Sequence, residues 1–314
     1  MSEFLHTKSF LLLVYSNKNS QLFNRAASKV VNEYDNTDKI GILYDDFDAN
    51  DEIKKEWEKK YKNIQIKCIA PRRTTLRMDD KIYLSKYMFD SKYIPKCYTK
   101  KEDIPIDVDN NKLFYVKRRG STGARGVYLY KYSDLLNIDC TDCIIQENSE
   151  TPHLYEDRRY KMRVYVLLHN NNVYMNKKAW CSLALKDYEL INDETTNDDM
   201  NAMNIIYQCP GRKWFEFKSI EQHEDIFENL KLSCFDFKNT FQDQINNIND
   251  KFFTLLGFDY VVDSNLDVKI IEINHRSNYA HPKDIVDNVD VPVLEDTMRV
   301  LIQNNTTNTD YTQI

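Results

Sequence analysis

The chain has 314 residues, of which 42% are hydrophobic and 29% are charged, a composition typical of globular proteins and not of disordered or fibrous ones. Its longest purely apolar run, Phe10–Tyr15, is far shorter than the roughly 20 residues of a membrane helix, and no secretory signal opens the chain, so we expect a cytoplasmic protein without a membrane partner. The net charge of −6 argues against nucleic acid as a partner, because binding a long polyanion requires a basic face.

The first 70 residues alternate strand and helix signals. Strands are expected at Ser9–Tyr15, Lys39–Tyr44 and Ile64–Ala70, and helices at Ser20–Tyr34 and Asn50–Lys62. This βαβαβ order predicts a small open parallel sheet. Because no GxGxxG follows the first strand, the pattern does not favour a Rossmann cofactor site.

The rest of the chain mixes strands and helices. We expect helices at Lys81–Phe89, Phe235–Leu256 and Val289–Ile302; strands at Leu113–Lys117, Val127–Lys131, Cys143–Gln146 and Met162–Leu168; and a hairpin of Phe258–Asp263 with Val268–Ile273. The polar, acidic stretch Asp187–Asn201 predicts a mobile loop, and the polar residues 304–314 predict a frayed tail.

Seven cysteines, an odd number spread along the chain, do not predict a disulfide framework. Cys140 and Cys143 form a CxxC pair, but no second pair and no neighbouring histidines complete the four ligands of a structural zinc site. We therefore expect these two residues to be buried thiols.

The hairpin carries the strongest chemical signal. In its second strand Glu272 and Asn274 alternate with isoleucines, so they share one face and the isoleucines take the other. Asp259 lies in the apolar first strand, and facing Glu272 across the hairpin requires a turn with an even number of residues or a bulge. Two carboxylates and an amide oxygen on one face suit Mg²⁺ bound together with phosphate. A half-exposed hairpin whose polar residues face water fits the same pattern.

Two basic segments accompany the hairpin. The loop Lys117-Arg-Arg-Gly-Ser-Thr-Gly-Ala-Arg-Gly126 offers backbone N–H groups and charge to phosphates, although it lacks the spacing of a Walker loop, and a flexible turn without a ligand is the alternative. Arg159, Lys161 and Arg163 alternate along a strand, so all three point to one side. Such a row repels itself unless an anion lies on it, and a solvated surface row is the alternative.

The order of these pieces resembles the tubulin–tyrosine ligase-like branch of the ATP-grasp enzymes. The resemblance rests on Tyr115-Val-Lys117 with its glycine loop, on Ile145-Gln146 through Arg159-Tyr-Lys-Met-Arg163, and on Leu256-Gly-Phe-Asp259 with Ile271-Glu-Ile-Asn274. It implies an α/β ATP-grasp fold with an N-terminal βαβαβ domain (residues 1–70), a central lobe (71–145), a C-terminal lobe with the Mg-ATP site (146–303) and a flexible tail (304–314).

The resemblance also implies residue roles. Lys117 would contact the nucleotide phosphates, as would Lys161, under a loop containing Gly120, Ser121, Gly123 and Arg125. Gln146, the Glu147 carbonyl and the Ser149 amide would bind adenine. Arg163 would reach the γ-phosphate, Asn204 would match an asparagine of the family, and Asp259, Glu272 and Asn274 would hold Mg²⁺.

Two of the departures of this chain from the family pattern bear on the substrate site. Lys161 stands where the family usually has an acidic residue. The proline that commonly follows the metal-binding asparagine is missing, and Arg276 lies two residues past Asn274. A guanidinium there fits a substrate carboxylate or phosphate. We expect Arg276 to hold the anionic group of the acceptor, with a surface pair to Asp284 or Asp287 as the alternative.

These observations predict an ATP- and Mg²⁺-dependent carboxylate–amine ligase that forms an amide through an acyl phosphate. The implied substrates are a carboxylate and an amine-bearing amino acid, peptide or protein, while the acidic net charge disfavours tubulin itself. Two alternatives are an ATP-grasp kinase acting on a small hydroxylated or phosphorylated acceptor and a nucleotide-binding module without turnover.

Overall fold

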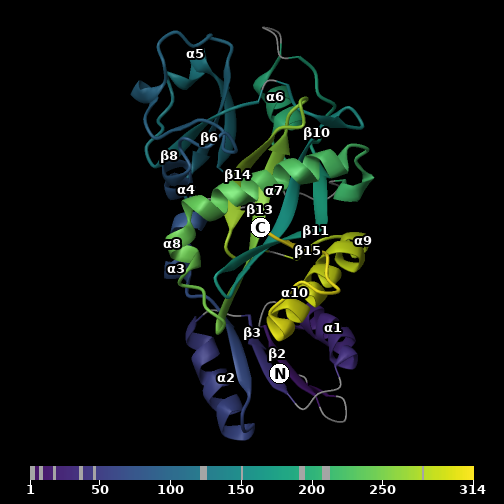
Figure 1. Cartoon of the computed structure of the whole chain (residues 1–314). Coiled ribbons are helices and arrows are strands. Elements are labelled where there is room, and N and C mark those ends of the chain that lie inside the picture. The colour runs from purple at the N-terminus through teal and green to yellow at the C-terminus, as the bar shows by residue number, and fades with distance from the viewer. Residues whose placement is uncertain are drawn as a thin grey trace.

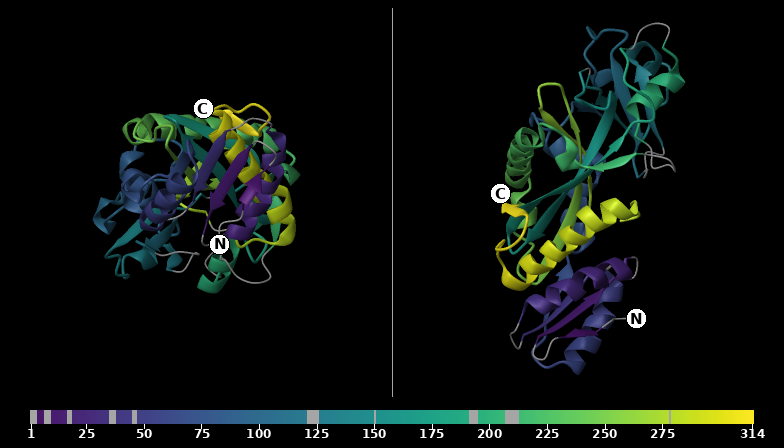
Figure 2. Two further views of the ribbon diagram at one scale, coloured as in Figure 1. Left: turned by 90° about the horizontal axis from the view of Figure 1, so that it is seen from below. Right: turned by 90° about the vertical axis from the view of Figure 1, so that its right-hand side faces the viewer.

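The computed structural model describes residues 4–6, 10–16, 19–34, 38–44, 47–120, 126–149, 151–190, 195–206, 213–277 and 279–314. The molecule is elongated, with the N-terminal strands at one end, a large sheet in the middle and a small separate sheet at the other end (Figure 1 and Figure 2). Helices of the described ranges are all too short or too polar to cross a membrane.

The N-terminal unit has the predicted βαβαβ order. Its elements are β1 (Phe4–His6), β2 (Leu11–Tyr15), α1 (Ser20–Val30), η1 (Val31–Glu33), β3 (Lys39–Leu43), α2 (Phe47–Lys60) and β4 (Gln65–Ile69). Strands β2, β3 and β4 are parallel, and β1 adds an antiparallel edge. Helix α1 covers the sheet with Phe23, Ala26, Ala27 and Val30, whose spacing follows one helical face.

The N-terminal sheet continues into the large sheet, which the sequence did not indicate. The large sheet and its helices comprise β9 (Leu154–Tyr155), β10 (Arg158–His169), β11 (Asn172–Leu183), α6 (Asn197–Asn204), β12 (Trp214–Glu216), η3 (Phe217–Ser219), α7 (His223–Thr240), α8 (Gln242–Ile245), β13 (Phe252–Val262), β14 (Val268–Asn274), α9 (Lys283–Ile285), η4 (Val286–Asp290), α10 (Val291–Gln303) and β15 (Tyr311–Gln313). Strand β4 pairs in parallel with β13, so eleven strands of the described ranges form one sheet.

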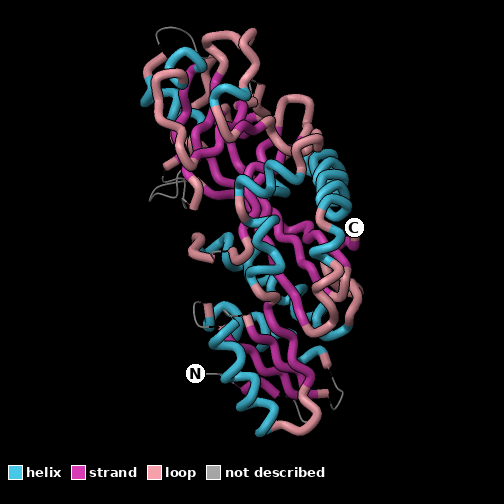
Figure 3. The backbone as a smooth tube through the Cα atoms, turned by 90° about the vertical axis from the view of Figure 1, so that its left-hand side faces the viewer, coloured by secondary structure: helices cyan, strands magenta, loops and turns pink. Residues whose placement is uncertain are grey.

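Helices cover both faces of the central strands. From β10, Met162, Val164 and Val166 pack in the same core as α7, whereas Tyr165 and Leu167 pack in the core that contains α1 and α10. Figure 3 shows the magenta strands of the large sheet with cyan helices beside them. The period of two in β10 thus places its apolar residues in two cores.

The small sheet lies beyond the helices that follow β4. This part contains α3 (Arg72–Asp79), α4 (Lys81–Tyr87), β5 (Cys97–Tyr98), η2 (Lys101–Asp103), β6 (Leu113–Arg118), β7 (Val127–Lys131), α5 (Tyr132–Leu135) and β8 (Cys143–Glu147). Its strand order is β5-β8-β6-β7, and Cys140 and Cys143 are buried free thiols in its core, as predicted. The predicted lobe boundary between residues 145 and 146 falls inside β8.

Three expected elements are wrong. The predicted helix 235–256 ends at Thr240, apart from the short α8, and Phe252–Leu256 belong to β13, because this apolar run fills the sheet core on both faces. The stretch 187–201 contains the start of α6, capped by the Thr196 hydroxyl, while 191–194 lie outside the described residues. The tail is not frayed, since β15 pairs with β11 and buries Tyr311.

Candidate active site

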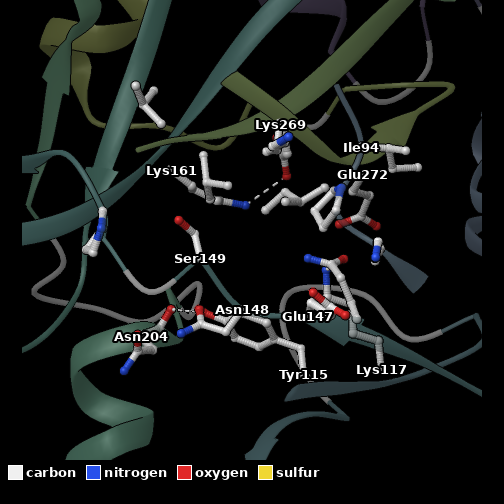
Figure 4. A pocket seen from close by; sticks show the side chains of 18 of the residues that line it. Ile94, Tyr115, Lys117, Glu147, Asn148, Ser149, Lys161, Asn204, Lys269 and Glu272 are labelled. Carbon is white, nitrogen blue, oxygen red and sulfur yellow. Dashed lines mark hydrogen bonds and ion pairs between the residues drawn. The ribbon is translucent and has the colours of Figure 1, made fainter. Parts of the chain in front are cut away.

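A cavity of about 540 Å³ lies between the small sheet and the large sheet. Such a volume is within the usual range for a site that holds a small molecule or nucleotide. Side chains reach it from both sheets: in Figure 4, Lys161 and Glu272 stand on one side, and Tyr115 and Lys117 on the other. The predicted residues that line it are Lys117, Gln146, Glu147, Ser149, Lys161, Asn204, Asp259 and Glu272.

The hairpin of β13 and β14 brings Asp259 opposite Glu272 through a bulge. Next to the turn, Val262 pairs with Val268 and Tyr260 with Ile270, a register that would place Asp259 opposite Ile271. The register shifts between Tyr260 and Asp259, so Asp259 pairs with Glu272. The expected facing of Asp259 and Glu272 is confirmed, and of the two alternatives, an even turn or a bulge, the structure has the bulge.

The bulge also changes which residues of β14 point to each face of the sheet. Ile271 lines the cavity beside Glu272, whereas Ile273 is buried in the core under α7. The expectation that the isoleucines all take the face opposite Glu272 is therefore wrong at Ile271, because the extra residue of a bulge interrupts strict alternation.

Asp259 is buried and held by two cations. Its Oδ2 accepts a hydrogen bond from Lys161 Nζ at 2.9 Å, and its Oδ1 accepts one from Arg163 Nε. Burial alone would raise the pKa of Asp259, but the charges of Arg163 and Lys161 outweigh it and hold this pKa well below its usual range. Asp259 is thus ionised, and each of its oxygens accepts a hydrogen bond from a cation. The side chains of Lys161 and Arg163 reach Asp259 from the same face of β10, as predicted.

The other two proposed metal ligands, Glu272 and Asn274, accept fewer hydrogen bonds from cations than Asp259 does. Glu272 Oε1 accepts a hydrogen bond from Lys81 Nζ at 2.7 Å, and the second oxygen of Glu272 has no partner among the described residues. Asn274 does not line the cavity; it pairs with Gly257, and its Nδ2 donates to the Gly257 carbonyl at 3.4 Å. No three acidic, histidine or cysteine side chains within the described ranges cluster closely enough to form a metal site.

Arg163 is buried behind Asp259 and packs against Gly257, where the side chain of any other residue would clash with it. Its guanidinium lies over the Trp180 ring, 5.4 Å from the centroid. A Cβ on Gly257 would come within 2.7 Å of the Arg163 Nη1 and 2.4 Å of the Ser277 hydroxyl oxygen. The Leu-Gly-Phe-Asp segment thus uses its glycine to admit the arginine.

Lys117 extends from β6 into the cavity and donates to Gln146 Oε1 at 2.7 Å. Burial lowers the pKa of Lys117 to about 8, although the charge of Glu272 partly opposes this effect. Gly120 begins the glycine loop with a φ of 72°, which suits a residue without a Cβ. The remaining loop candidates, Ser121, Gly123 and Arg125, lie outside the described residues.

The predicted adenine-binding segment lies at the end of β8. The Glu147 carboxylate accepts hydrogen bonds from Tyr98 at 2.8 Å and Lys112 at 2.9 Å, so its side chain is held by the small sheet. The Glu147 N–H donates to the Lys96 carbonyl at 2.9 Å. The Ser149 carbonyl accepts a hydrogen bond from Arg159, which fixes this turn against β10.

Arg159 and Lys81 line the site but were not among the predicted site residues. Arg159 is buried, and its described hydrogen-bond partners are neutral: the oxygens of Asn148, Asn204 and Ser149, and the Tyr115 hydroxyl. A buried cation without a carboxylate partner favours an anionic ligand. Its place in the alternating basic row was the available signal, whereas nothing in the sequence linked Lys81 to Glu272.

Asn204 supports Arg159 from the end of α6. Its Oδ1 accepts from Arg159, and its Nδ2 donates to the Met200 carbonyl at 2.8 Å. Arg276, in contrast, is not among the cavity residues. It lies over the Tyr44 ring, 5.7 Å from the centroid, and donates to the Tyr44 carbonyl at 3.4 Å, while Asp287 pairs with Arg25 and Lys283.

Comparisons with known proteins identify the family and the fold. The model of the tubulin-tyrosine ligase family matches residues 43–309. A probable beta-tubulin polyglutamylase of Tetrahymena thermophila is 22% identical over 207 residues, which cover 54% of this chain and 17% of that protein. This chain therefore spans about one sixth of the length of that relative.

The fold has a solved counterpart. The C-terminal domain of K. lactis Pby1, described as an ATP-grasp enzyme that interacts with the mRNA decapping enzyme Dcp2, superposes with a TM-score of 0.62 at 15% identity. The match covers 97% of this chain and 98% of that one. The α/β ATP-grasp fold predicted from the sequence is thereby confirmed.

Proposed function

Because the chain belongs to the tubulin–tyrosine ligase family, we propose that it is an ATP- and Mg²⁺-dependent ligase that joins an amine to a carboxylate as an amide. The predicted enzyme class, an ATP-grasp ligase, is that of the family. The observation that carries the proposal is the meeting of Lys117, Lys161, Asp259 and Glu272 at one cavity between two sheets, with Arg163 buried behind Asp259.

In this proposal the nucleotide lies along the cavity. The segment from Gln146 to Ser149 would bind adenine, and Lys117 and Lys161 would bind the phosphates from the two sheets. Arg163 would stabilise the charge that develops on the γ-phosphoryl group, because a buried and prealigned guanidinium needs little rearrangement to do so.

The metal would bind at Glu272, whereas Asn274 does not line the cavity and fits less well. Glu272 fits Mg²⁺ because it has an oxygen without a partner among the described residues at the cavity wall, and Mg²⁺ commonly uses one or two carboxylates together with substrate phosphates. When bound, Mg²⁺ would supply charge to the phosphates of ATP. Asp259 fits less well, since both of its oxygens already accept hydrogen bonds from cations.

The proposed reaction has two steps. A substrate carboxylate oxygen attacks the γ-phosphorus, the bond to the ADP oxygen breaks, and an acyl phosphate forms. An amine nitrogen then attacks the acyl carbon, the bond to the phosphate oxygen breaks, and the nitrogen loses a proton to give the amide. The chain's own residues hold the phosphates and exclude water from the cavity between the sheets.

An amino acid joined to a protein or peptide is the proposed product. The polyglutamylase similarity supports this choice, although the chain spans only a small part of that relative. The excess of cations at the cavity also suits a phosphorylated acceptor, which keeps a kinase as the second candidate.

An oxygen-transfer experiment separates the two candidates. Candidate acids labelled with ¹⁸O in the carboxylate are incubated with the protein, ATP, Mg²⁺ and amines. A ligase that uses an acyl phosphate transfers one labelled oxygen to inorganic phosphate. A kinase transfers no label to phosphate and leaves its product phosphorylated, which would overturn the proposal.

A further inference from the structure

The contacts of Asp259 differ from those expected of a metal ligand. Its side chain is only 2% exposed, and its two oxygens accept hydrogen bonds from Lys161 and Arg163, the Lys161 contact being 2.9 Å long. A cation that bound Asp259 Oδ2 would approach the Lys161 ammonium closely, and the two like charges would repel each other.

Lys161 lines the cavity and also forms an ion pair with Asp259. Its side chain is 13% exposed and lines the cavity, and Figure 4 shows its nitrogen directed into the space that Glu272 also faces. Its position on β10, two residues from Arg163 on the same face, fixes the ammonium beside Asp259. The cationic end of Lys161 therefore lies at the cavity wall beside the Asp259 carboxylate.

We propose that the Lys161 ammonium takes the place of one divalent cation, so that the chain binds a single Mg²⁺ with its nucleotide, at Glu272. Asp259 then anchors Lys161 and Arg163 and does not bind metal. Lys161 touches the nucleotide phosphates directly and supplies the charge that a second metal ion would otherwise provide. The inference rests on the proposed ATP site but not on the identity of the acceptor.

The number of bound metal ions tests this directly. Mn²⁺, used in place of Mg²⁺, is titrated into the full chain with a saturating, non-hydrolysable ATP analogue, and bound Mn²⁺ is counted by electron paramagnetic resonance. The wild type should bind one Mn²⁺ per chain. Lys161→Asp, which removes the ammonium and adds a carboxylate beside Asp259, should bind two, with the line broadening of a coupled pair.

A matched variant controls for a general change of charge. Lys269 also lines the cavity, but its ammonium contacts the Lys92 carbonyl and not Asp259. Lys269→Met should keep one Mn²⁺ per chain. Lys161→Met gives a second measurement if Lys161→Asp does not fold: without the ammonium, a second Mn²⁺ should bind, more weakly than in Lys161→Asp.

The number of bound Mn²⁺ ions tests the inference independently of whether the protein is a ligase or a kinase. Two Mn²⁺ ions or none in the wild type would overturn it, as would a single Mn²⁺ in folded, nucleotide-binding Lys161 variants. One Mn²⁺ in the wild type and two in Lys161→Asp would support it, even if the oxygen-transfer experiment showed a kinase in place of a ligase.

Discussion

Asp259 and Glu272 face each other across β13 and β14 because a bulge moves their register by one residue. The two carboxylates nevertheless differ. Asp259 is buried and bound by two cations, whereas Glu272 has a 30% exposed side chain and keeps one oxygen without a described partner. We therefore propose different roles for them, with Asp259 as the anchor of Lys161 and Arg163 and Glu272 as the metal ligand.

The first prediction concerns Glu272→Gln. Removing this charge should lower the rate of ADP formation by about 100-fold or more, because the metal would lose its carboxylate ligand. The unfolding temperature should change little, since the side chain is partly exposed and the amide fits the same space. Glu228→Gln, an exposed glutamate on α7 paired with Lys231, is the control. Turnover within a few-fold of the wild type would remove Glu272 from the metal site.

The second prediction is a pH dependence of ATP binding. Burial lowers the pKa of Lys117 to about 8, so the free protein loses this charge as the pH rises through 8. ATP binds the protonated form, and its affinity should fall by about fivefold between pH 8 and pH 9. Lys117→Arg, which stays protonated, should remove this dependence, and Lys117→Ala should weaken binding at every pH. An ATP affinity of the wild type that is flat over this interval would contradict the assignment of Lys117.

The lowered pKa of Lys117 also determines how its contribution to the free energy of unfolding changes with pH. Its pKa in the folded state lies below its unfolded value, so the unfolded chain binds more protons between pH 8 and 10.5. The contribution of Lys117 to stability should therefore rise with pH across this window. In Lys117→Met this rise should be lost, which denaturant unfolding at pH 8 and pH 10 can measure. An equal rise in both proteins would mean that Lys117 is not the group responsible.

The third prediction tests the packing of Arg163. In Gly257→Ala the new methyl group would meet the Ser277 hydroxyl and the Arg163 guanidinium. Unfolding free energy should fall by about 1–3 kcal/mol, and ATP turnover should fall with it as Arg163 is displaced. Adding Ser277→Ala should recover part of the stability by removing the closest contact, with Ser277→Ala alone as the control. A Gly257→Ala protein with wild-type stability would show that the site is not closely packed.

The fourth prediction concerns Arg276, which we propose binds the acceptor from outside the cavity, where it lies against Tyr44. Arg276→Ala should raise the acceptor KM by about tenfold or more and leave the ATP KM within about twofold. Arg276→Lys should recover only part of the loss, because the paired hydrogen bonds of a guanidinium are absent. Arg25→Ala, which removes an exposed pair with Asp287, is the control. Equal changes for both substrates would exclude Arg276 from the acceptor site.

Much of the fold followed from residue patterns. Apolar runs separated by helical spacing predicted the parallel strands β2, β3 and β4, and the period of two in β10 predicted that Arg159, Lys161 and Arg163 share one face. Local periodicity did not predict the pairing of β4 with β13, because that contact joins segments that lie far apart in the chain.

The rest of the site depended on contacts that local patterns do not encode. The bulge at Ile271 is set by the pairing of two strands, and the Lys81–Glu272 contact joins a helix to a strand 191 residues later. The environment of Arg159 comes from β6, the residue that follows β8, and α6 together. Phe252–Leu256 show the limit of periodicity, since a short apolar run suits a buried strand and a helix equally.

The most direct test of the central claim is the product of the reaction. The protein is incubated with ATP, Mg²⁺, a pool of amino acids and a mixture of peptides with free carboxylates, and the peptides are analysed by mass spectrometry; Glu272→Gln is the control. We predict peptides that gain an amino acid in an amide bond, formed only with ATP and the wild-type protein, together with ADP and inorganic phosphate. Phosphorylated peptides or small molecules without any new amide, formed by the wild type and not by the variant, would contradict this claim.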